Sequence, residues 1–216
     1  MGSSRLPGKV LKPFGSGSML ACLVERIGYA RTIDSIVVAT TTHERDDILV
    51  EESTRLGATT FRGSEFDVLD RYLRAARVSK AQIVVRVTAD NPFTDPDSID
   101  RVVNHIRLGY DYAIELNMPV GTTGEAVTMA GLEFMHRVAR TPAFREHVTL
   151  FAKENPHLMR CGFLRAPREL ARSDMSFTVD RQEDYDFAQT LFKKLSGVNF
   201  SLQELITLAD TPIVQV

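Results

Sequence analysis

Short apolar runs alternate with segments of helical periodicity along the first half of the chain, and this alternation restricts the fold more than any other feature. Runs typical of strands occupy residues 35–40, 58–62, 81–88 and 110–116. The stretches between them repeat apolar residues every three or four positions, as amphipathic helices do. Repeated strand-helix units of this length build a mostly parallel sheet with helices on both faces. The sequence therefore predicts an α/β fold.

The second half of the chain is less regular but adds elements of both kinds. We expect a strand leading into a helix over 124–131, and a single helix over 144–156. Two more strands and then two more helices are expected at 159–166, 175–180, 182–197 and 202–210. Because no internal repeat or linker interrupts the pattern, we expect one domain over residues 1–216.

Charge and composition exclude several classes of function. The chain has 26 basic and 28 acidic residues, so it lacks the basic excess of a nucleic-acid-binding protein. No apolar run approaches the roughly 18 residues that span a bilayer, and the start has no signal-peptide pattern. The two cysteines, Cys22 and Cys161, lie in apolar surroundings typical of small buried residues. We expect a cytoplasmic protein with neither nucleic acid nor membrane as a partner.

Polar and charged side chains follow several expected strands at the point where each strand ends. Thr40 and Arg62 follow the first two strands, Asp90 follows the third, and Asp180 follows the last. Ligands of open α/β sheets bind outside the carboxyl ends of the strands. We therefore expect these side chains to gather at one edge of the sheet.

Two aspartates at one sheet edge suit Mg²⁺, which takes oxygen ligands and binds through one or two carboxylates plus substrate phosphates. Other interpretations stay open on spacing alone. Asp90 also suits a cap of the turn before Pro92, and Asp180, with Glu183 three residues later, suits a helix N-terminus. If both carboxylates bind one ion, they lie within about 10 Å of each other.

The first eleven residues, MGSSRLPGKVL, combine a flexible Gly and Ser run with two cations, Arg5 and Lys9. Flexible backbone and positive charge are typical of a phosphate-binding loop. The alternative is that both side chains are solvated at a frayed terminus. Together with the aspartates, these cations indicate transfer of a phosphorus-containing group from a nucleotide.

Six segments together resemble the cytidylyltransferases that make CMP-activated acidic sugars, with the branch named for spore coat polysaccharide biosynthesis protein F most similar. CMP-Kdo synthetase and acylneuraminate cytidylyltransferase are more distantly similar. The segments are MGSSRLPGKVL, IVVATTT, FRGSEFDVLDRY, VRVTADNPFTDP, REHVT and FTVDRQEDYDF. The resemblance implies a Rossmann-like three-layer αβα nucleotide-diphospho-sugar transferase fold with a mostly parallel sheet.

The reaction that the resemblance implies is attack by a sugar hydroxyl on the α-phosphorus of CTP, which gives a CMP-sugar and pyrophosphate. By the same resemblance, Asp90 and Asp180 are the Mg²⁺ ligands, and Arg5, Lys9 and Asp90 are the catalytic residues. The residues implied at the nucleotide are Gly2, Ser3, Ser4, Arg5, Lys9, Thr40, Arg62 and Arg71.

The acceptor side is implied by two further segments. PVGTTGEAV stands where the family has a glycine-rich acceptor-binding segment, and REHVT supplies an arginine suited to a sugar carboxylate. Glu146 and His147 of REHVT have a second interpretation, in which they only order the start of a helix. We expect CTP and an acidic sugar as partners, and a homodimer. The implied acceptor residues are Gly121, Glu125, Arg145, Glu146 and His147.

In relatives, an apolar strand leads into the loop that MGSSRLPGK forms, and the methionine is an interior residue. Here that residue is Met1. We therefore expect the first strand of the family's sheet to be missing from this chain, and the natural protein to extend roughly ten residues upstream. Neighbouring strands then lose a ladder partner, at about 1–3 kcal/mol for each buried group left unpaired. We expect such a chain to aggregate or to be inactive.

Two other functions stay open at this point. A glycosyltransferase of the related A-type fold usually carries an Asp-x-Asp motif after a strand, whereas residues 89–95 read ADNPFTD, which argues against it. A degenerate nucleotide-binding protein keeps the pocket without turnover. Pyrophosphate release on mixing the protein with CTP and Mg²⁺ separates these functions from a cytidylyltransferase.

Overall fold

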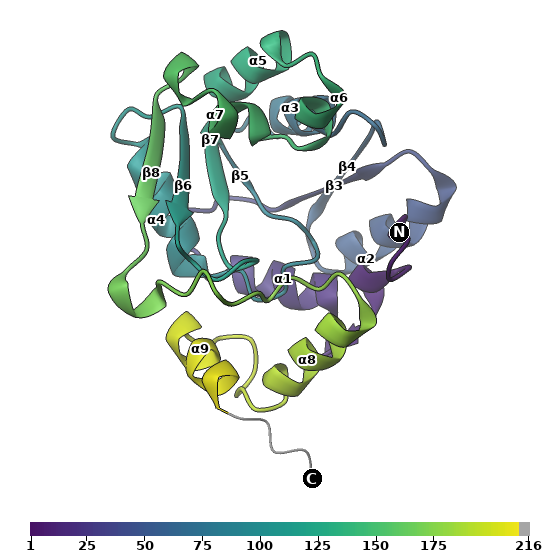
Figure 1. Ribbon diagram of the computed structural model, residues 1–216. Helices are drawn as coiled ribbons and strands as arrows, with labels where there is room; N and C mark the ends of the chain where they lie inside the picture. Colours follow the sequence, from purple (N-terminus) through teal and green to yellow (C-terminus); the bar gives the residue numbers. More distant parts are fainter. Residues whose placement is uncertain (212–216) are drawn as a thin grey trace.

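The computed structural model describes residues 1–211, and strands and helices alternate along the chain (Figure 1). The strands are β1 (Pro13–Phe14), β2 (Gly17–Ser18), β3 (Val37–Thr41), β4 (Thr59–Gly63), β5 (Ile83–Arg86), β6 (Tyr112–Leu116), β7 (Glu125–Thr128) and β8 (Cys161–Arg165). The helices are α1 (Met19–Ile27), α2 (Asp47–Arg55), α3 (Val68–Val78), α4 (Pro96–Ile106), α5 (Met129–Val138), α6 (Pro142–Glu146), α7 (Leu150–Glu154), α8 (Gln182–Phe192) and α9 (Leu202–Asp210).

The main sheet has four strands in the order β5-β7-β6-β8, a second sheet pairs β3 with β4, and the short strands β1 and β2 form a separate antiparallel pair. The pairs β3 with β4 and β6 with β8 are parallel, whereas β7 is antiparallel to both of its neighbours. Three of the four strands of the main sheet therefore run in one direction. This confirms the expected α/β fold with a mainly parallel sheet.

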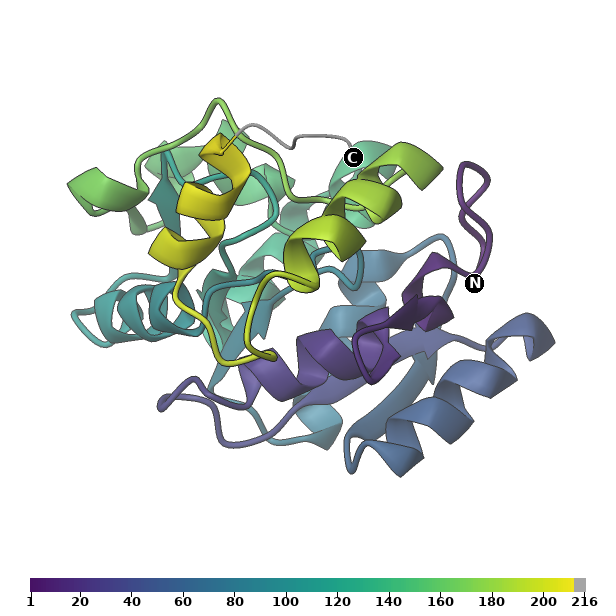
Figure 2. The ribbon, with the colours of Figure 1, turned by 90° about the horizontal axis from the view of Figure 1, so that it is seen from below.

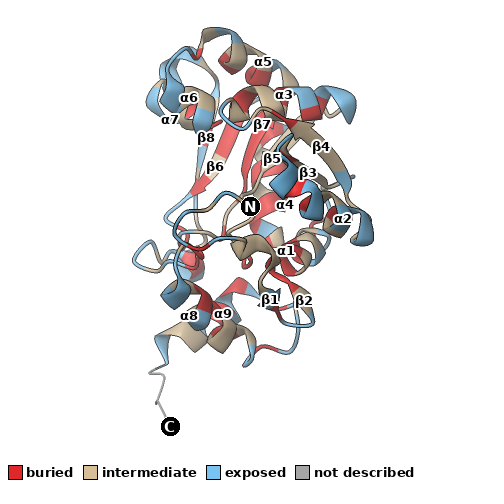
Figure 3. Ribbon diagram, turned by 90° about the vertical axis from the view of Figure 1, so that its right-hand side faces the viewer, coloured by how far each residue is buried: buried red, intermediate tan, exposed pale blue. Residues whose placement is uncertain are grey.

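Helices cover both faces of the sheets, which gives three layers. On one face, α3, α5 and α7 pack on the strands through a core that includes Leu69, Leu132 and Phe151. On the other face, Ile27 of α1 and Ile99 of α4 belong to a second core against the strands. Figure 3 shows buried positions concentrated along the strands and on the helix faces that meet them.

A third core joins α8 and α9 to the segment that carries α1 (Figures 1 and 2). Phe93 is fully buried there, and its ring meets those of Phe14, Phe177 and Phe200 edge-on, with centroids 5.8 to 6.0 Å away. Aromatic pairs favour this geometry. Because Phe93 comes three residues after Asp90, the core fixes the loop that follows β5.

The helix expected over 144–156 is wrong as a single element. The chain forms α6 and α7 instead, with a break between Glu146 and Leu150. The break turns Val148 and Thr149 into the interior, where both side chains are buried. Burial of these residues outweighs the helical periodicity of the segment.

The strand expected over 175–180 is also wrong, apart from an isolated bridge to Val120. This segment divides its backbone hydrogen bonds between two loops. The N–H of Phe177 donates to the carbonyl of Val120, and the N–H of Val179 donates to the carbonyl of Asp90, each at 2.8 Å. No continuous ladder forms, but the end of the segment is brought beside the loop after β5.

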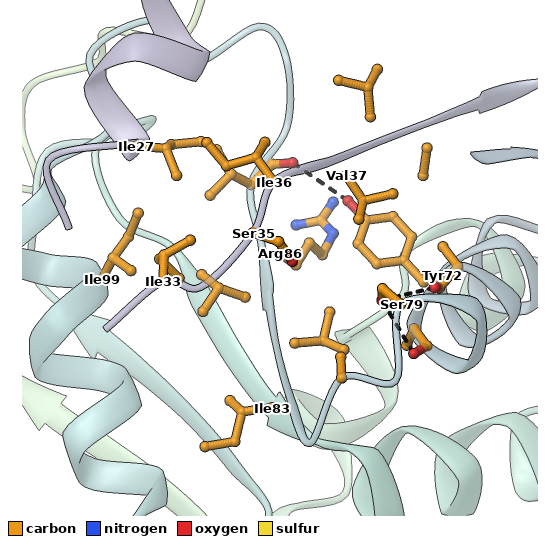
Figure 4. Close-up of a pocket in the computed structure, with 18 of the residues that line it drawn as sticks. Ile27, Ile33, Ser35, Ile36, Val37, Tyr72, Ser79, Ile83, Arg86 and Ile99 are labelled. Carbon is orange, nitrogen blue, oxygen red and sulfur yellow. Dashed lines mark hydrogen bonds between the residues drawn. The ribbon is translucent and has the colours of Figure 1, made fainter. Parts of the chain in front are cut away.

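The two sheets do not join within the described part of the chain. β3 pairs with β4 and β5 pairs with β7, and a cavity of about 850 Å³ lies between β3 and β5 (Figure 4). Side chains from both strands and from α1, α3 and α4 line this cavity.

Arg26 fastens α1 to the segment that precedes α9. Its side chain is fully buried, with Nε donating to the carbonyl of Thr94 at 3.0 Å and Nη1 to that of Val198 at 2.6 Å. The guanidinium carbon lies 3.6 Å from the centroid of the Phe200 ring. Burial lowers the pKa of Arg26 to about 10, so the group stays charged at neutral pH.

Replacing Arg26 with alanine should lower the free energy of unfolding by about 3 kcal/mol or more, because buried carbonyls lose their donor. Urea denaturation at neutral pH measures the change. The matched control is Arg77→Ala, which removes an exposed ion pair with Glu133 and should cost under about 1 kcal/mol. Equal losses in the two variants would contradict the role of Arg26.

Candidate active site

Lys9 is the centre of a cluster of opposite charges beyond the carboxyl end of β5. Its ammonium nitrogen donates to Asp90 Oδ2 at 2.9 Å and to Asp180 Oδ1 at 3.0 Å. The carbonyl of Val179 accepts a third bond at 2.8 Å, and Arg5 Nη2 lies 2.9 Å from the same Asp180 oxygen. Because one nitrogen contacts both carboxylates, these two oxygens are no more than about 6 Å apart. The two carboxylates expected at Mg²⁺ and the two cations expected at the phosphates therefore meet.

Backbone geometry positions the cation and one of the carboxylates. Gly8 has a φ of +67°, a left-handed conformation that glycine adopts readily, and it starts a single 3₁₀ turn over Lys9–Leu11. This turn places the ammonium of Lys9 against the loop after β5, where it contacts Asp90. On that loop, buried Phe93 anchors the segment that carries Asp90.

Asp184, rather than Asp180, accepts the backbone N–H groups at the start of α8. Its Oδ2 accepts the N–H of Asp180 at 2.9 Å and that of Arg181 at 2.8 Å. The interpretation of Asp180 as the helix cap is therefore wrong, and its carboxylate is free to meet cations. Burial would raise the pKa of Asp180, but the hydrogen bond and charge of Lys9, with Arg5, hold this pKa below its usual value.

A glycine brings a third segment against the cluster. Gly121 has a φ of +86°, and a Cβ there would lie 2.6 Å from Thr178 Oγ1 and 2.9 Å from Asn91 Oδ1. The Thr178 hydroxyl donates to that Asn91 oxygen at 2.9 Å. Only glycine fits so close an approach, and it lets the segments that carry Asp90 and Asp180 pack together.

α8 also holds the segment that follows Lys9. The hydroxyl of Tyr185 and the side-chain amide of Gln189 both donate to the carbonyl of Pro13, the amide at 3.0 Å. Figure 2 shows α8 lying beside the amino-terminal segment. The amino-terminal segment that carries Lys9 and the segment that carries Asp180 are therefore joined at a second point.

Asp46 forms a buried polar centre that the sequence pattern does not reveal. Its carboxylate accepts the hydroxyls of Thr40 at 2.8 Å and Thr41 at 2.6 Å, and the amine of Met1 at 3.1 Å. Burial alone would raise the pKa of Asp46, but these hydrogen bonds hold it well below its usual range. The only sequence pattern that marks Asp46 is its place five residues after the end of β3. Aspartates at such positions are common in surface loops, so the pattern does not predict a buried carboxylate.

Thr40 and Arg62 lie at the carboxyl ends of β3 and β4, where the sequence placed them. The Thr40 hydroxyl donates to the buried carboxylate described above. Arg62 donates to the carbonyls of Thr41 and His43, each at 2.9 Å, and pairs with Asp47 at 2.6 Å. It therefore secures the loop between β3 and α2, and its contact with a nucleotide stays a prediction.

The backbone of Gly2 to Ser4 runs past this loop. A Cβ on Gly2 would lie 2.9 Å from a guanidinium nitrogen of Arg45, so the chain passes close to that side chain. The hydroxyl of Ser3 accepts the N–H of Leu6 at 3.2 Å, and Ser4 is exposed. The contact of these amides with phosphate stays a prediction.

Arg71 of α3 lies against β4 and lines the cavity between β3 and β5. Its Nη1 donates to the carbonyl of Ser64 at 2.6 Å, while its buried Nε has no partner among residues 1–211. Burial lowers the pKa of Arg71. Buried donors are normally paired, so this guanidinium retains capacity for an acceptor, and its role at the nucleotide stays a prediction.

Glu125 is buried on β7 in a network of its own. It accepts the hydroxyl of Tyr112 at 2.5 Å and pairs with Arg86 at 3.1 Å and with Lys153 at 3.0 Å. Burial would raise the pKa of Glu125, but Lys153, Tyr112 and Arg86 together hold it below its usual value. These contacts tie β7 to β5, β6 and α7, which is a structural role.

Arg145 is also engaged by protein groups. It forms an ion pair with Asp67 and donates to the carbonyl of His136 at 3.0 Å. Glu146 and His147 follow it at the end of α6. Within residues 1–211, Arg145 and Glu125 have no hydrogen-bond or ion-pair partner in common, so no contact shows that they belong to one site. Among the residues implied at the acceptor, Gly121 lies nearest the charged segments, because it packs against Asn91 and Thr178.

Comparison with known proteins supplies the family. Residues 1–206 match the sequence model of the family described as cytidylyltransferase. The chain belongs to the cytidylyltransferase family. It is 40% identical over 217 residues to the spore coat polysaccharide biosynthesis protein SpsF of Bacillus subtilis (strain 168), a match that covers 97% of this chain and 90% of SpsF.

Two further comparisons agree with this family. The chain is 28% identical over 172 residues to the 3-deoxy-manno-octulosonate cytidylyltransferase of Anaeromyxobacter dehalogenans (strain 2CP-1 / ATCC BAA-258), a match that covers 70% of this chain and 69% of that one. The structure of a cytidylyltransferase from Leptospira borgpetersenii superimposes with a TM-score of 0.90 and 31% identity, over 96% of this chain and 89% of the other. The nucleotide-diphospho-sugar transferase fold expected from the sequence is thereby confirmed.

Replacing Asp46 with asparagine should lower the free energy of unfolding by about 2 kcal/mol at pH 7. Because the pKa of Asp46 is lowered by folding, its contribution is present above the usual aspartate pKa near 4 and is lost as the pH falls through the folded-state value. Urea denaturation of both proteins between pH 7 and pH 3 should show the difference shrinking with acidification. Asp34→Asn, on an exposed loop, is the control and should show no such trend.

Proposed function

We propose that this cytidylyltransferase transfers CMP from CTP to a hydroxyl of an acidic sugar, with Mg²⁺ held by Asp90 and Asp180. The observation that carries the proposal is the convergence of these two carboxylates on the Lys9 ammonium, with Arg5 beside them. Two acidic and two basic side chains at the carboxyl end of a strand suit a nucleotide triphosphate with its divalent ion.

The donor set fits the proposed ion. Lys9 occupies one oxygen of each carboxylate, which leaves Oδ1 of Asp90 and Oδ2 of Asp180 without a partner among the described residues. Both side chains are partly open to solvent, at 26% and 32% exposure. Residues 1–211 hold no cluster of three or more metal-ligating side chains, and Mg²⁺ commonly uses only one or two carboxylates together with substrate phosphates.

The proposed transfer forms a bond between the sugar oxygen and the α-phosphorus and breaks the bond from that phosphorus to the β-phosphate bridging oxygen. The sugar hydroxyl loses its proton, and pyrophosphate leaves. A bound Mg²⁺ would offset negative charge on the phosphates. Lys9 and Arg5 supply fixed positive charge beside the same phosphates, which stabilises the charge that develops on the leaving group.

No covalent nucleophile is needed for this reaction. Burial raises the pKa of the Cys22 thiol to about 12, so the thiol is protonated and unreactive at neutral pH. Cys161 is half-buried, and burial raises the pKa of its thiol too. Direct in-line transfer, which depends on position and electrostatics, is therefore the mechanism that these side chains support.

Similarity to a 3-deoxy-manno-octulosonate cytidylyltransferase supports an acid as the acceptor. Similarity to a protein of spore coat polysaccharide biosynthesis supports a product used in surface glycans. Within the acceptor set, Gly121 is the residue whose position beside the cluster supports a contact with substrate. The homodimer and the cytoplasmic location stay predictions, and residues 1–211 contain no helix long and apolar enough to cross a membrane.

The proposal predicts pyrophosphate release when the protein is mixed with CTP, Mg²⁺ and a panel of acidic sugars, with CTP preferred over other nucleotides. Asp90→Asn should reduce the release at least 100-fold while shifting the melting temperature by no more than about 3 °C, because this side chain is partly exposed. A colorimetric pyrophosphate assay and a thermal melt provide both readouts. Asp97→Asn, at a position with 73% exposure, is the control.

A result in which Asp90→Asn loses fold and activity together would show a structural role for this carboxylate. CTP binding without pyrophosphate release, for every acid in the panel, would favour the degenerate nucleotide-binding protein instead.

Arg5 gives a second, independent prediction. Its side chain is 56% exposed and pairs with Asp180, so it is free to move to a phosphate. Arg5→Ala should raise KM for CTP about tenfold with an unchanged melting temperature, because a charge-assisted contact to the triphosphate is lost. Arg168→Ala, at an exposed arginine that has no ion pair within residues 1–211, should leave KM unchanged. An equal KM in both variants would remove Arg5 from the nucleotide site.

A further inference from the structure

Two buried carboxylates lie beside the β6–β7 loop, residues 117–124, and the proposed transfer does not use them. Glu115 is on β6 with a side chain 1% exposed, and Asp95 precedes α4 with a side chain 6% exposed. Burial raises the pKa of Asp95, and the charge of Arg101 offsets only part of this rise. Buried acids need hydrogen-bond partners, so their contacts show which segments they join.

Arg101 of α4 joins the two carboxylates. Its Nε donates to Glu115 Oε1 at 2.8 Å, and its Nη2 donates to Glu115 Oε2 at 3.0 Å and to Asp95 Oδ2 at 3.2 Å. A planar guanidinium that holds one carboxylate by two bonds fixes its orientation as well as its distance. The start of α4 and the end of β6 are therefore held in a defined relative position.

Ser98 of α4 connects this charged pair to the β6–β7 loop. Its hydroxyl is fully buried, donates to Glu115 Oε2 at 2.7 Å and lies 2.9 Å from the Thr123 hydroxyl. A serine hydroxyl has one hydrogen, so the Thr123 hydroxyl is the donor to Ser98, with the carbonyl of Gly124 at 3.0 Å as its second acceptor. The neighbouring carbonyl of Thr122 accepts the N–H of Asp95 at 2.7 Å.

The other side of the β6–β7 loop contacts the segment that leads to Asp180. The N–H of Val120 donates to the carbonyl of Met175 at 2.9 Å, and the carbonyl of Val120 accepts the N–H of Phe177 at 2.8 Å. Between these two attachments lies Gly121, which packs against Asn91 and Thr178 as described above. The place of Gly121 therefore depends on how the loop is held from the α4 side.

We propose that Ser98 is a positioning residue for the acceptor. Through its hydrogen bonds to Glu115 and Thr123, it holds the β6–β7 loop where Gly121 meets the segments that carry the two aspartates of the site. Ser98 is fully buried, so it acts through the loop and not by contact with substrate. The inference rests on the proposed function, which places the acceptor at Gly121.

The composition of the network supports a positioning role over a purely stabilising one. Buried ion pairs add little net stability, and apolar side chains in the same place are often at least as stabilising. Directed hydrogen bonds give a defined geometry that apolar contacts do not. Each member of the network bonds to a different segment, and the β6–β7 loop is the one that reaches the site.

The first experiment measures steady-state pyrophosphate release with CTP, Mg²⁺ and the acid that the wild-type chain uses best. Ser98→Ala should raise KM for the acid about fivefold while KM for CTP changes by less than about twofold. The matched control is Ser53→Ala in α2, where an equally buried hydroxyl donates to the carbonyl of Leu49 at 2.6 Å. This control should leave both KM values unchanged.

Variants of Thr123 test the same hydrogen bond from the loop side. Thr123→Val removes the hydroxyl and keeps the side-chain shape, and it should raise KM for the acid as much as Ser98→Ala does. Thr123→Ser keeps the hydroxyl and should restore the wild-type KM. In the double variant of Ser98→Ala and Thr123→Val the two effects should not add, because both changes remove one shared bond.

Amide hydrogen exchange tests the positioning role without turnover. Exchange at the amides of Val120 and Phe177 should accelerate at least about fivefold in Ser98→Ala and not in Ser53→Ala, because only the first change loosens the β6–β7 loop. The two proposals can therefore fail separately. A wild-type chain that releases no pyrophosphate with any acid contradicts the proposed function, and the exchange result still decides the role of Ser98.

Four outcomes would overturn the proposal. The first is unchanged exchange at Val120 and Phe177 in Ser98→Ala, and the second is an unchanged KM for the acid in that variant. The third is a raised KM in Thr123→Val alone, which would mean that Thr123 touches the acceptor itself. The fourth is an equal effect of Ser53→Ala, which would leave the network a general structural role.

Discussion

The ion pairs of the Lys9 ammonium unite parts of the chain that no local interaction would bring together. Asp90 and Asp180 repel each other when both are ionised, so a cation between them is a condition for their closeness. Lys9 supplies it from the amino-terminal segment, and a backbone carbonyl fixes its third bond. Phe93 and Gly121 then hold the surrounding loops, so the charges sit on a packed support rather than on free loops.

The cluster suits the proposed function because it holds charges of both signs. The triphosphate of CTP carries about four negative charges near neutral pH, and fixed cations offset its repulsion of two nearby carboxylates. In this structure Arg5 and Lys9 pair with the aspartates. Under the proposed function, phosphate oxygens would take the place of carboxylate oxygens as the partners of these two cations.

Much of the fold and of this cluster follows from sequence, because strand ends in an α/β sheet converge at one edge. Asp90 and Lys9 were placed there by that rule and by the family resemblance. The remaining features depend on contacts between residues far apart in the sequence, which local patterns do not predict. Asp184, and not Asp180, accepts the backbone N–H groups at the start of α8. The role of Asp46 depends on its hydrogen bonds to the amine of Met1 and to two threonine hydroxyls, which only the folded chain brings together. Residues 144–156 keep helical periodicity, yet the helix breaks where Val148 and Thr149 turn into the interior.

The shared grip of Tyr185 and Gln189 on the carbonyl of Pro13 has a mechanical consequence. Asp180 lies two residues before α8, and Pro13 lies four residues after Lys9. The ion pair of Lys9 with Asp180 and the hydrogen bonds to the carbonyl of Pro13 therefore join the same two segments at two separate points. Two points of attachment restrict rotation as well as separation, so the ion pair is held in orientation as well as in distance.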